Sequence, residues 1–391
     1  MKSKLLSAAT AVLLLSSMSA QTPPAAGGPA SREAAALAEP FRGITTDGKV
    51  QPGLFHIRST GVTTAPVRKA ADAFLAALTP EQRARTTFPV DDIEWRKWMN
   101  VHRYNRQGVS FLEMTEAQRT VTFGLLRASL SAKGLKLSQD IMKLNHTLGE
   151  LNNNNFTEYG EWLYHITVMG EPSATKPWGW QIDGHHLIIN YFVLGDQVVM
   201  SPAFYGSEPV IARAGKYQGV SILQEEQRRG LKMLRALDAA QRQVAVLDAR
   251  KTGNNNYAEG FKDNVVVLSE GLLAAALTGA QREELLQLVG LFVNNMDDGH
   301  AKVKLEEVRA HLDQTRFAWI GGNSDDSVFY FRIQSPVLLI EFDHQRPANT
   351  RHLQKDPQLP IRDHIHVVVR TPNGNDYGKD LLRQHLEQHP H

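Results

Sequence analysis

Hydrophobic and polar residues alternate in the segment RDHIHVVVRTPNGNDYG at residues 362–378. The alternation separates two sets of side chains: Ile365, Val367 and Val369 in one, His364, His366 and Arg370 in the other. Because successive side chains of a β-strand point to opposite faces, the pattern predicts a strand with one apolar face and one polar face.

Three other segments show the same alternation. The polar positions are His165 and Thr167 in WLYHITV, His186 and Asn190 in HHLIINYF, and Glu341 and Asp343 in VLLIEFD. We expect these strands to turn their apolar faces toward a core and their polar faces toward one common basin.

Four short segments predict helix starts: LTPEQR from Leu78, MTEAQR from Met114, LDAAQR from Leu237 and LTGAQR from Leu277. In each, Thr or Asp is followed three residues later by Gln, so that two side chains satisfy free backbone donors of the first helical turn. Capping explains these residue types, and the repeated Gln-Arg is therefore interpreted as structural.

The sequence also repeats itself at longer range. WQIDGHHLIINYF from Trp180 aligns without a gap with FRIQSPVLLIEFD from Phe331, at an offset of 151 residues. VVMSP from Val198 resembles VVRTP from Val368 at an offset of 170, which implies a loop inserted at residues 344–363. We predict an α+β fold of two copies of one unit, each with capped helices followed by antiparallel strands, related by a pseudo-twofold axis. The expected ranges are 66–220 for the first repeat, 221–384 for the second and 385–391 for a polar tail.

The first twenty residues have the layout of a secretory signal peptide. Lys2 and Lys4 precede an apolar run from Leu5 to Leu15, and small residues follow as far as Ala20. That run is too short to span a bilayer, and no later segment is long and apolar enough for a membrane helix. Residues 21–65 are expected to form a linker with one short strand at 54–58. We expect the mature chain in the periplasm or the medium.

Composition narrows the chemistry. The chain has no cysteine, which excludes thiolate nucleophiles, cysteine-bound zinc and disulfides. Its formal charge of +2 falls to zero once the two signal-peptide lysines are removed. A balanced chain with no basic run gives no reason to expect nucleic acid as a partner.

The predicted polar face carries several histidines, two carboxylates and an arginine, but no lysine. Histidine is both the common proton shuttle near neutral pH and the common metal ligand. Two imidazoles at positions i and i+2 of a strand can converge, and with a carboxylate from another strand they suit zinc, manganese, iron or copper. We predict Glu341, His364 and His366 as metal ligands.

The other polar residues are given supporting roles. His186 is predicted as a fourth ligand or a general base, Asp343 as a group that orients a histidine or takes a proton, and Arg370 as a holder of anionic substrate groups. Three residues are predicted to contact the substrate: Asn190, His165 and Trp180. Trp180 lies in PWGW, which is either an aromatic platform or a turn that fills the core.

Three functions fit these residues. The first is an exported metal-dependent enzyme, most simply a hydrolase, acting on a small-molecule or saccharide-like substrate. The second is a protein that binds a carboxylated or sugar-like ligand without turnover. The third is a metal-free His/Arg acid–base enzyme such as a polysaccharide lyase.

The segments LTPEQR, PWGWQIDGHHL, YFRIQSPVLLIEFDHQ and HIHVVVRTPNGNDYGKDLLRQH together resemble the bacterial family Domain of Unknown Function 3500. The resemblance covers about residues 66–386. It implies an exported or enzyme-like protein of one repeated architecture. The family carries no established activity, so no catalytic residue is transferred from it.

Overall fold

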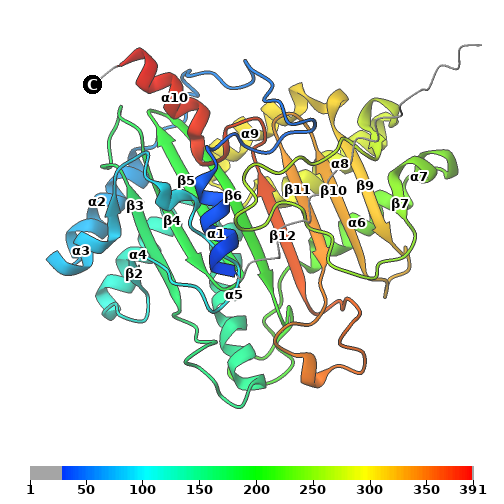
Figure 1. The fold of residues 1–391 in the computed structure, drawn as a ribbon, viewed down its shortest axis with the longest axis horizontal. Coiled ribbons are helices and arrows are strands. Elements are labelled where there is room, and N and C mark those ends of the chain that lie inside the picture. Colours follow the sequence, from blue (N-terminus) through cyan, green and yellow to red (C-terminus); the bar gives the residue numbers. More distant parts are fainter. Residues whose placement is uncertain (1–28, 390–391) are drawn as a thin grey trace, which may run out of the picture.

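The computed structural model describes residues 29–389; the predicted signal peptide lies outside the described residues. Within residues 29–389 the strands form one twelve-stranded sheet, with helices packed on one face and mainly irregular segments on the other (Figure 1). The presence of helices beside a mixed sheet confirms the α+β class.

Ten of the strands form one continuous path, and two short strands pair beside it. The strands are β1 Thr87–Phe88, β2 Val109–Ser110, β3 Tyr164–Met169, β4 Trp178–Gly184, β5 Leu187–Leu194, β6 Gln197–Ser207, β7 Val246–Asp248, β8 Leu272–Leu273, β9 Arg316–Gly321, β10 Phe329–Gln334, β11 Leu339–His344 and β12 Ile365–Arg370. Their order is β1-β3-β4-β5-β6-β12-β11-β10-β9-β7, with β2 beside β3 and β8 beside β9. Neighbours are antiparallel, except that β1 runs parallel to β3 and β7 parallel to β9.

The helices include four that begin at the predicted capping boxes. They are α1 Pro29–Ala38, α2 Ala65–Ala77, α3 Pro80–Thr86, α4 Glu116–Ser129, α5 Ala132–Leu151, α6 Gln224–Arg235, α7 Ala239–Ala245, α8 Gly279–Val293, α9 Asp298–Ala310 and α10 Lys379–Gln388. The reciprocal bonds of a capping box are present at the starts of α3, α4, α7 and α8, which confirms that prediction. The capping glutamines also pair, because Gln118 donates to Gln82 and Gln281 bonds with Gln241.

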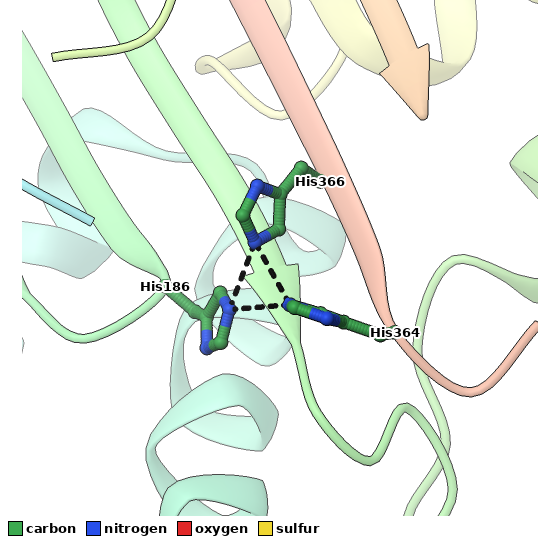
Figure 2. A group of neighbouring side chains, drawn as sticks. All are labelled: His186, His364 and His366. Carbon is green, nitrogen blue, oxygen red and sulfur yellow. Dashed lines mark hydrogen bonds between the residues drawn. The ribbon is translucent and has the colours of Figure 1, made fainter. Parts of the chain in front are cut away.

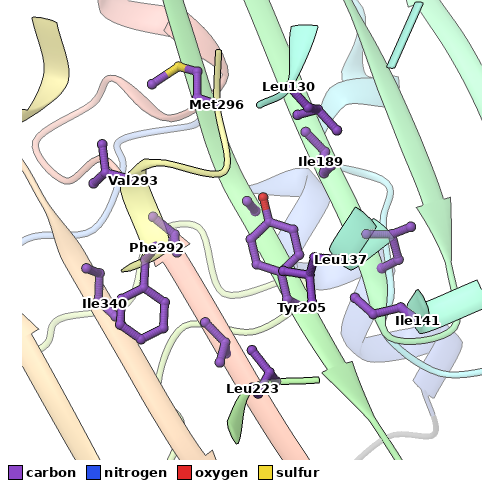
Figure 3. Close-up of a cluster of buried hydrophobic side chains, with 14 of the residues drawn as sticks. Leu130, Leu137, Ile141, Ile189, Tyr205, Leu223, Phe292, Val293, Met296 and Ile340 are labelled. Carbon is purple, nitrogen blue, oxygen red and sulfur yellow. The ribbon is translucent and has the colours of Figure 1, made fainter. Parts of the chain in front are cut away.

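The helix-covered face of the sheet holds the main hydrophobic core. Ile189 of β5 and Ile340 of β11 pack in one cluster with Ile141 of α5 and with Phe292 and Val293 of α8 (Figure 3). The predicted apolar positions of β5, β11 and β12 all belong to this cluster. Alternation therefore identified the core-facing side of each strand correctly.

The opposite face is also buried, although it carries the polar residues. Trp98, Ile188, Phe204 and Tyr377 belong to a second hydrophobic cluster, to which the N-terminal segment contributes Phe55. Loops before β2 and before β8, together with α10, cover this face. The polar face is consequently an interior layer rather than a solvated surface.

Two predicted boundaries differ from the structure. Residues 54–58, expected to form a short strand, have no strand pairing and lie against the sheet as an irregular segment. The expected polar tail overlaps α10, which continues to Gln388. Leu381 and Leu382 of α10 are buried and anchor the helix to the rest of the protein. The charged residues around them led to the prediction of a polar tail.

The order of helices and strands from α2 to β6 is the same as the order from α6 to β12. β6 and β12 are neighbours in the middle of the sheet. Among the described helices, none combines the length and apolarity needed to cross a membrane.

Candidate metal centre

His186 occupies a tight turn rather than a strand. β4 and β5 are joined through His185 and His186, with Gly184 and Leu187 paired across the hairpin. The φ of His186 is 63°, in the left-handed region, where histidine is more common than most non-glycine residues. Such a conformation costs about 1–2 kcal/mol and is found preferentially at functional sites.

His364 and His366 come from the start of β12. The residue paired with His366 on β6 is Gly206. A Cβ at Gly206 would lie 2.5 Å from the carbonyl oxygen of Ile365 and 3.1 Å from Cδ2 of His186. The missing side chain therefore leaves room for the His186 ring to approach β12.

The Nε2 atoms of the three histidines converge on one point (Figure 2). His186 Nε2 lies 3.3 Å from His364 Nε2 and 3.1 Å from His366 Nε2, and the latter two are 3.0 Å apart. All three residues are buried, with exposed fractions of 5%, 3% and 7%. His366 of β12 and His364, which directly precedes β12, are thus joined by a third histidine from a distant turn.

Two of the rings are fixed in the tautomer that a metal needs. His364 Nδ1 donates to the carbonyl oxygen of Arg346 at 2.7 Å, and His366 Nδ1 donates to Glu259 Oε1 at 2.7 Å. A neutral imidazole with its proton on Nδ1 has a lone pair on Nε2. The lone pairs of His364 and His366 therefore face each other at 3.0 Å, an arrangement that a cation between them stabilises.

The triangle of nitrogens has the dimensions of a metal site. Its centre lies about 1.8 Å from each corner, so a point about 2.0–2.1 Å from all three nitrogens, the usual zinc–nitrogen distance, lies about 1 Å off their plane. Among the described residues, the group with mutually close ligand atoms consists of these three histidines. Three protein ligands are fewer than the four of a structural zinc site, so a metal held here would need a further ligand from outside the group.

Burial favours the neutral, ligand-competent form of His186 and His366. Burial lowers the pKa of His186 and His366 well below the ordinary value, and the neighbouring imidazoles lower it further. Glu208 lies 3.7 Å from His364 Nδ1. Burial raises the pKa of Glu208, but His364, the Thr350 hydroxyl and backbone N–H groups outweigh burial and lower it. An anionic carboxylate thus lies behind His364, where it would offset the charge of a cation held by the cluster.

A family model described as Protein of unknown function (DUF3500) matches residues 60–379. The chain belongs to this family. The match includes all three histidines and confirms the resemblance noted in the sequence. No curated protein and no solved structure matches the chain.

The predicted carboxylate ligand of this DUF3500 protein is used elsewhere. Glu341 accepts hydrogen bonds from the backbone N–H groups of Tyr257 and Ala258 and from the hydroxyl of Tyr330. It does not belong to the three-histidine group, so the structure replaces Glu341 with His186 in the candidate ligand set. Burial raises the pKa of Glu341, and the three donors oppose that rise.

Asp343 is the partner of His366 across β11 and β12 but is bonded to other groups. Lys251 Nζ lies 2.9 Å from Asp343 Oδ1, and the backbone N–H of Asn255 donates to Oδ2 at 2.7 Å. Burial raises the pKa of Asp343 to about 7 against the opposing charge of Lys251. Its hydrogen bonds attach a loop to the sheet and do not orient a histidine.

Arg370, predicted to hold substrate, is completely enclosed. Its Nε lies 2.8 Å from Asp376 Oδ2 and its Nη2 lies 2.6 Å from Asp263 Oδ1. Burial opposes the charge of Arg370, but Asp376 and Asp263 outweigh burial and raise its pKa. This guanidinium is neutralised inside the protein and does not face the histidines.

The three predicted substrate contacts also lie apart from the cluster. Asn190 is buried, donates to the carbonyl of Pro202 and accepts from Gln181. Trp180 projects into the helix-side core, where it stacks on Tyr191. His165 is partly exposed, and burial lowers its pKa to about 4.

Sequence reasoning missed the residues that support the histidines. Glu259 lies in the polar loop that contains GNNN at residues 253–256, and Glu208 directly follows the end of β6. Both residues lie outside the strands, so the alternation of polar and apolar residues gives no signal for either. His185 stacks on His186 with ring centroids 4.1 Å apart and bonds to Asn145.

Proposed function

We propose that this DUF3500 protein is a metal-dependent enzyme, most simply a hydrolase, whose metal is held by His186, His364 and His366. The supporting observation is the convergence of three Nε2 atoms at 3.0–3.3 Å, with the lone pairs of His364 and His366 fixed toward the centre. Three neutral nitrogen donors suit zinc, copper or iron better than manganese, which favours oxygen.

A cation with three neutral ligands supplies a Lewis acid and lowers the pKa of a bound water toward neutrality. The chain's own contribution is to hold the three imidazoles in one orientation and to place carboxylates behind two of them. Burial of the cluster excludes bulk water, which strengthens electrostatic effects at the reacting group. A small-molecule or saccharide-like substrate would have to reach the remaining coordination position of such a cation.

The geometry gives less support to a metal-free His/Arg enzyme. Such an enzyme needs a cation facing the substrate, and Arg370 is bound to two aspartates within the protein. A protein that binds without turnover through Arg370, Asn190 and the tryptophans has less support, because Arg370 and Asn190 are buried and bonded within the protein. A binding protein would instead have to hold its ligand at the histidine centre, and an activity assay distinguishes it from the enzyme.

Two further proposals concern the whole chain. Export to the periplasm or medium rests on the signal-like residues 1–20. Internal duplication is supported by the recurring order of elements and by the positive φ of both Gly170 and Gly321, which correspond at the offset of 151 residues.

The hydrolase proposal is tested by stripping the protein with chelator, reloading it separately with zinc, copper, iron or manganese, and assaying nitrophenyl esters, phosphate esters, amides and glycosides. We expect turnover of one bond class by one reloaded form, absent from the stripped protein and from His364→Ala/His366→Ala. Stoichiometric metal without turnover of any class would favour the binding protein. Equal turnover with and without metal would favour the metal-free enzyme.

A further inference from the structure

The loop at residues 253–263 passes over the polar face of the sheet and is attached there by buried carboxylates. Glu341 accepts from the N–H groups of Tyr257 and Ala258 at 2.9 Å each, and Asp343 accepts from that of Asn255 at 2.7 Å. A free loop would leave both carboxylates buried without these donors, at a considerable desolvation cost. The buried carboxylates of the sheet therefore stabilise the loop, and the N–H groups of the loop stabilise those carboxylates.

The other end of the loop is attached just as firmly. Arg370 Nη1 donates to the carbonyl of Ala258 at 3.1 Å, and Arg370 Nη2 donates to Asp263 at 2.6 Å. Arg96 Nε donates to the second oxygen of Asp263 at 2.8 Å. Anchors thus lie on both sides of Glu259, the residue between Ala258 and Gly260.

Glu259 reaches the metal centre from this anchored segment. Its Oε1 accepts from His366 Nδ1 at 2.7 Å and from Asn256 Nδ2 at 2.9 Å. Gly260 lets the backbone approach the segment beneath it, since a Cβ there would lie 2.8 Å from Met99 Sδ and 2.9 Å from the carbonyl oxygen of Trp98. The conformation of the loop thus places the Glu259 carboxylate against Nδ1 of His366, on the side of the ring opposite Nε2.

We propose that Glu259 is a positioning residue that holds His366 as an Nε2 ligand, and that Glu341 acts through it by fixing the backbone next to it. The inference rests on the proposed metal centre and deepens it. Without Glu259, the His366 ring is free to rotate or to carry its proton on Nε2, and either change removes the lone pair from the metal. A carboxylate behind a ligating histidine also raises the basicity of the imidazole.

The test measures zinc affinity by chelator competition, and the visible spectrum of the cobalt-substituted protein, in full-length variants without a tag. Glu259→Ala is expected to weaken zinc binding by about 10- to 100-fold and to change the cobalt spectrum. Glu259→Gln keeps an acceptor for His366 and should lose less. Glu158→Ala is the matched control: its carboxylate is 27% exposed against 22% for Glu259 and lies near His102, outside the cluster.

Glu341→Gln replaces one of the two carboxylate oxygens that bind the Tyr257 and Ala258 N–H groups by an NH2 group, and should also weaken zinc binding. Because Glu341 acts through Glu259, adding Glu341→Gln to Glu259→Ala is expected to cause no further loss. Wild-type affinity and spectrum in Glu259→Ala, an equal loss in Glu158→Ala, or additive losses in the double variant would each overturn the inference while leaving the metal centre intact. Absence of zinc binding in the wild type would overturn both.

Discussion

His186→Asn separates the metal site from the fold most cleanly. The substitution removes the third imidazole, while asparagine adopts the left-handed conformation of this turn, φ 63°, more readily than most residues. It also removes the His186 Nε2 that faces the Nε2 atoms of His364 and His366. We therefore expect the metal-free variant to be within about 1 kcal/mol of the metal-free wild type in its free energy of unfolding.

The metal-loaded proteins should differ clearly. At a free zinc concentration 1,000 times Kd, binding stabilises the folded state by about 4 kcal/mol. For residues 29–389, an unfolding entropy of about 2.1 cal/mol/K per residue gives about 0.76 kcal/mol/K, so the Tm of the wild type should rise by about 5 °C. His186→Asn retains two ligands and should show little of this rise.

The assay is calorimetric unfolding of chelator-treated protein with and without zinc. His165→Asn is the control, because His165 shares the polar face but lies outside the three-histidine group. It should keep the full rise in Tm. A rise in His186→Asn equal to that of the wild type would refute His186 as a ligand, and a loss of the rise in His165→Asn would refute the separation of the two histidines.

Other substitutions test the layers around the centre. Arg370→Met leaves the buried Asp376 without its cation and Asp263 with Arg96 alone, and should cost about 3–5 kcal/mol in urea unfolding; a loss below about 1 kcal/mol would contradict the ion-pair account. Gly206→Ala pushes a Cβ against the backbone of β12 and should weaken zinc binding more than about tenfold in chelator competition, whereas unchanged affinity would show that the ring has room to spare. Burial lowers the pKa of His344 from its ordinary value of 6.5 to about 3, so the unfolded state binds more protons than the folded state as the pH falls below 6.5. From pH 7 to 5 the free energy of unfolding should therefore fall more steeply in the wild type than in His344→Gln, by up to about 1.4 kcal/mol per pH unit. Equal slopes in the two proteins would contradict this.

Alternation predicted which face the polar residues within the strands occupy, although His186 lies in a turn before β5. It separated His364 and His366 from Ile365 and Val367, and the structure places the latter pair in the helix-side core. The same rule applied to β4 would have placed Trp180 with Ile182 in that core, against the interpretation of PWGW as a platform. A strand pattern fixes the side of a residue because the side-chain period is two.

The alternation could not predict which polar residues of that face lie close to one another. Glu341 and Arg370 share the face of the histidines, but a loop from residues 253–263 lies over that face and takes their hydrogen bonds. Nothing in the periodicity of the strands indicates where an irregular loop will fold. For the same reason Glu259, which carries no strand or helix signal, was found only from its contact with His366.

The most direct test of the account is the metal content of the protein, purified without a tag or chelator and measured by elemental analysis. His364→Ala/His366→Ala is the comparison, since it keeps the histidine-rich C-terminus and so corrects for metal taken up there. We predict about one equivalent of a transition metal per chain in the wild type and almost none in the variant, with both proteins folded. Equal metal contents in the two proteins, after incubation with zinc, copper, iron or manganese, would contradict the three-histidine centre.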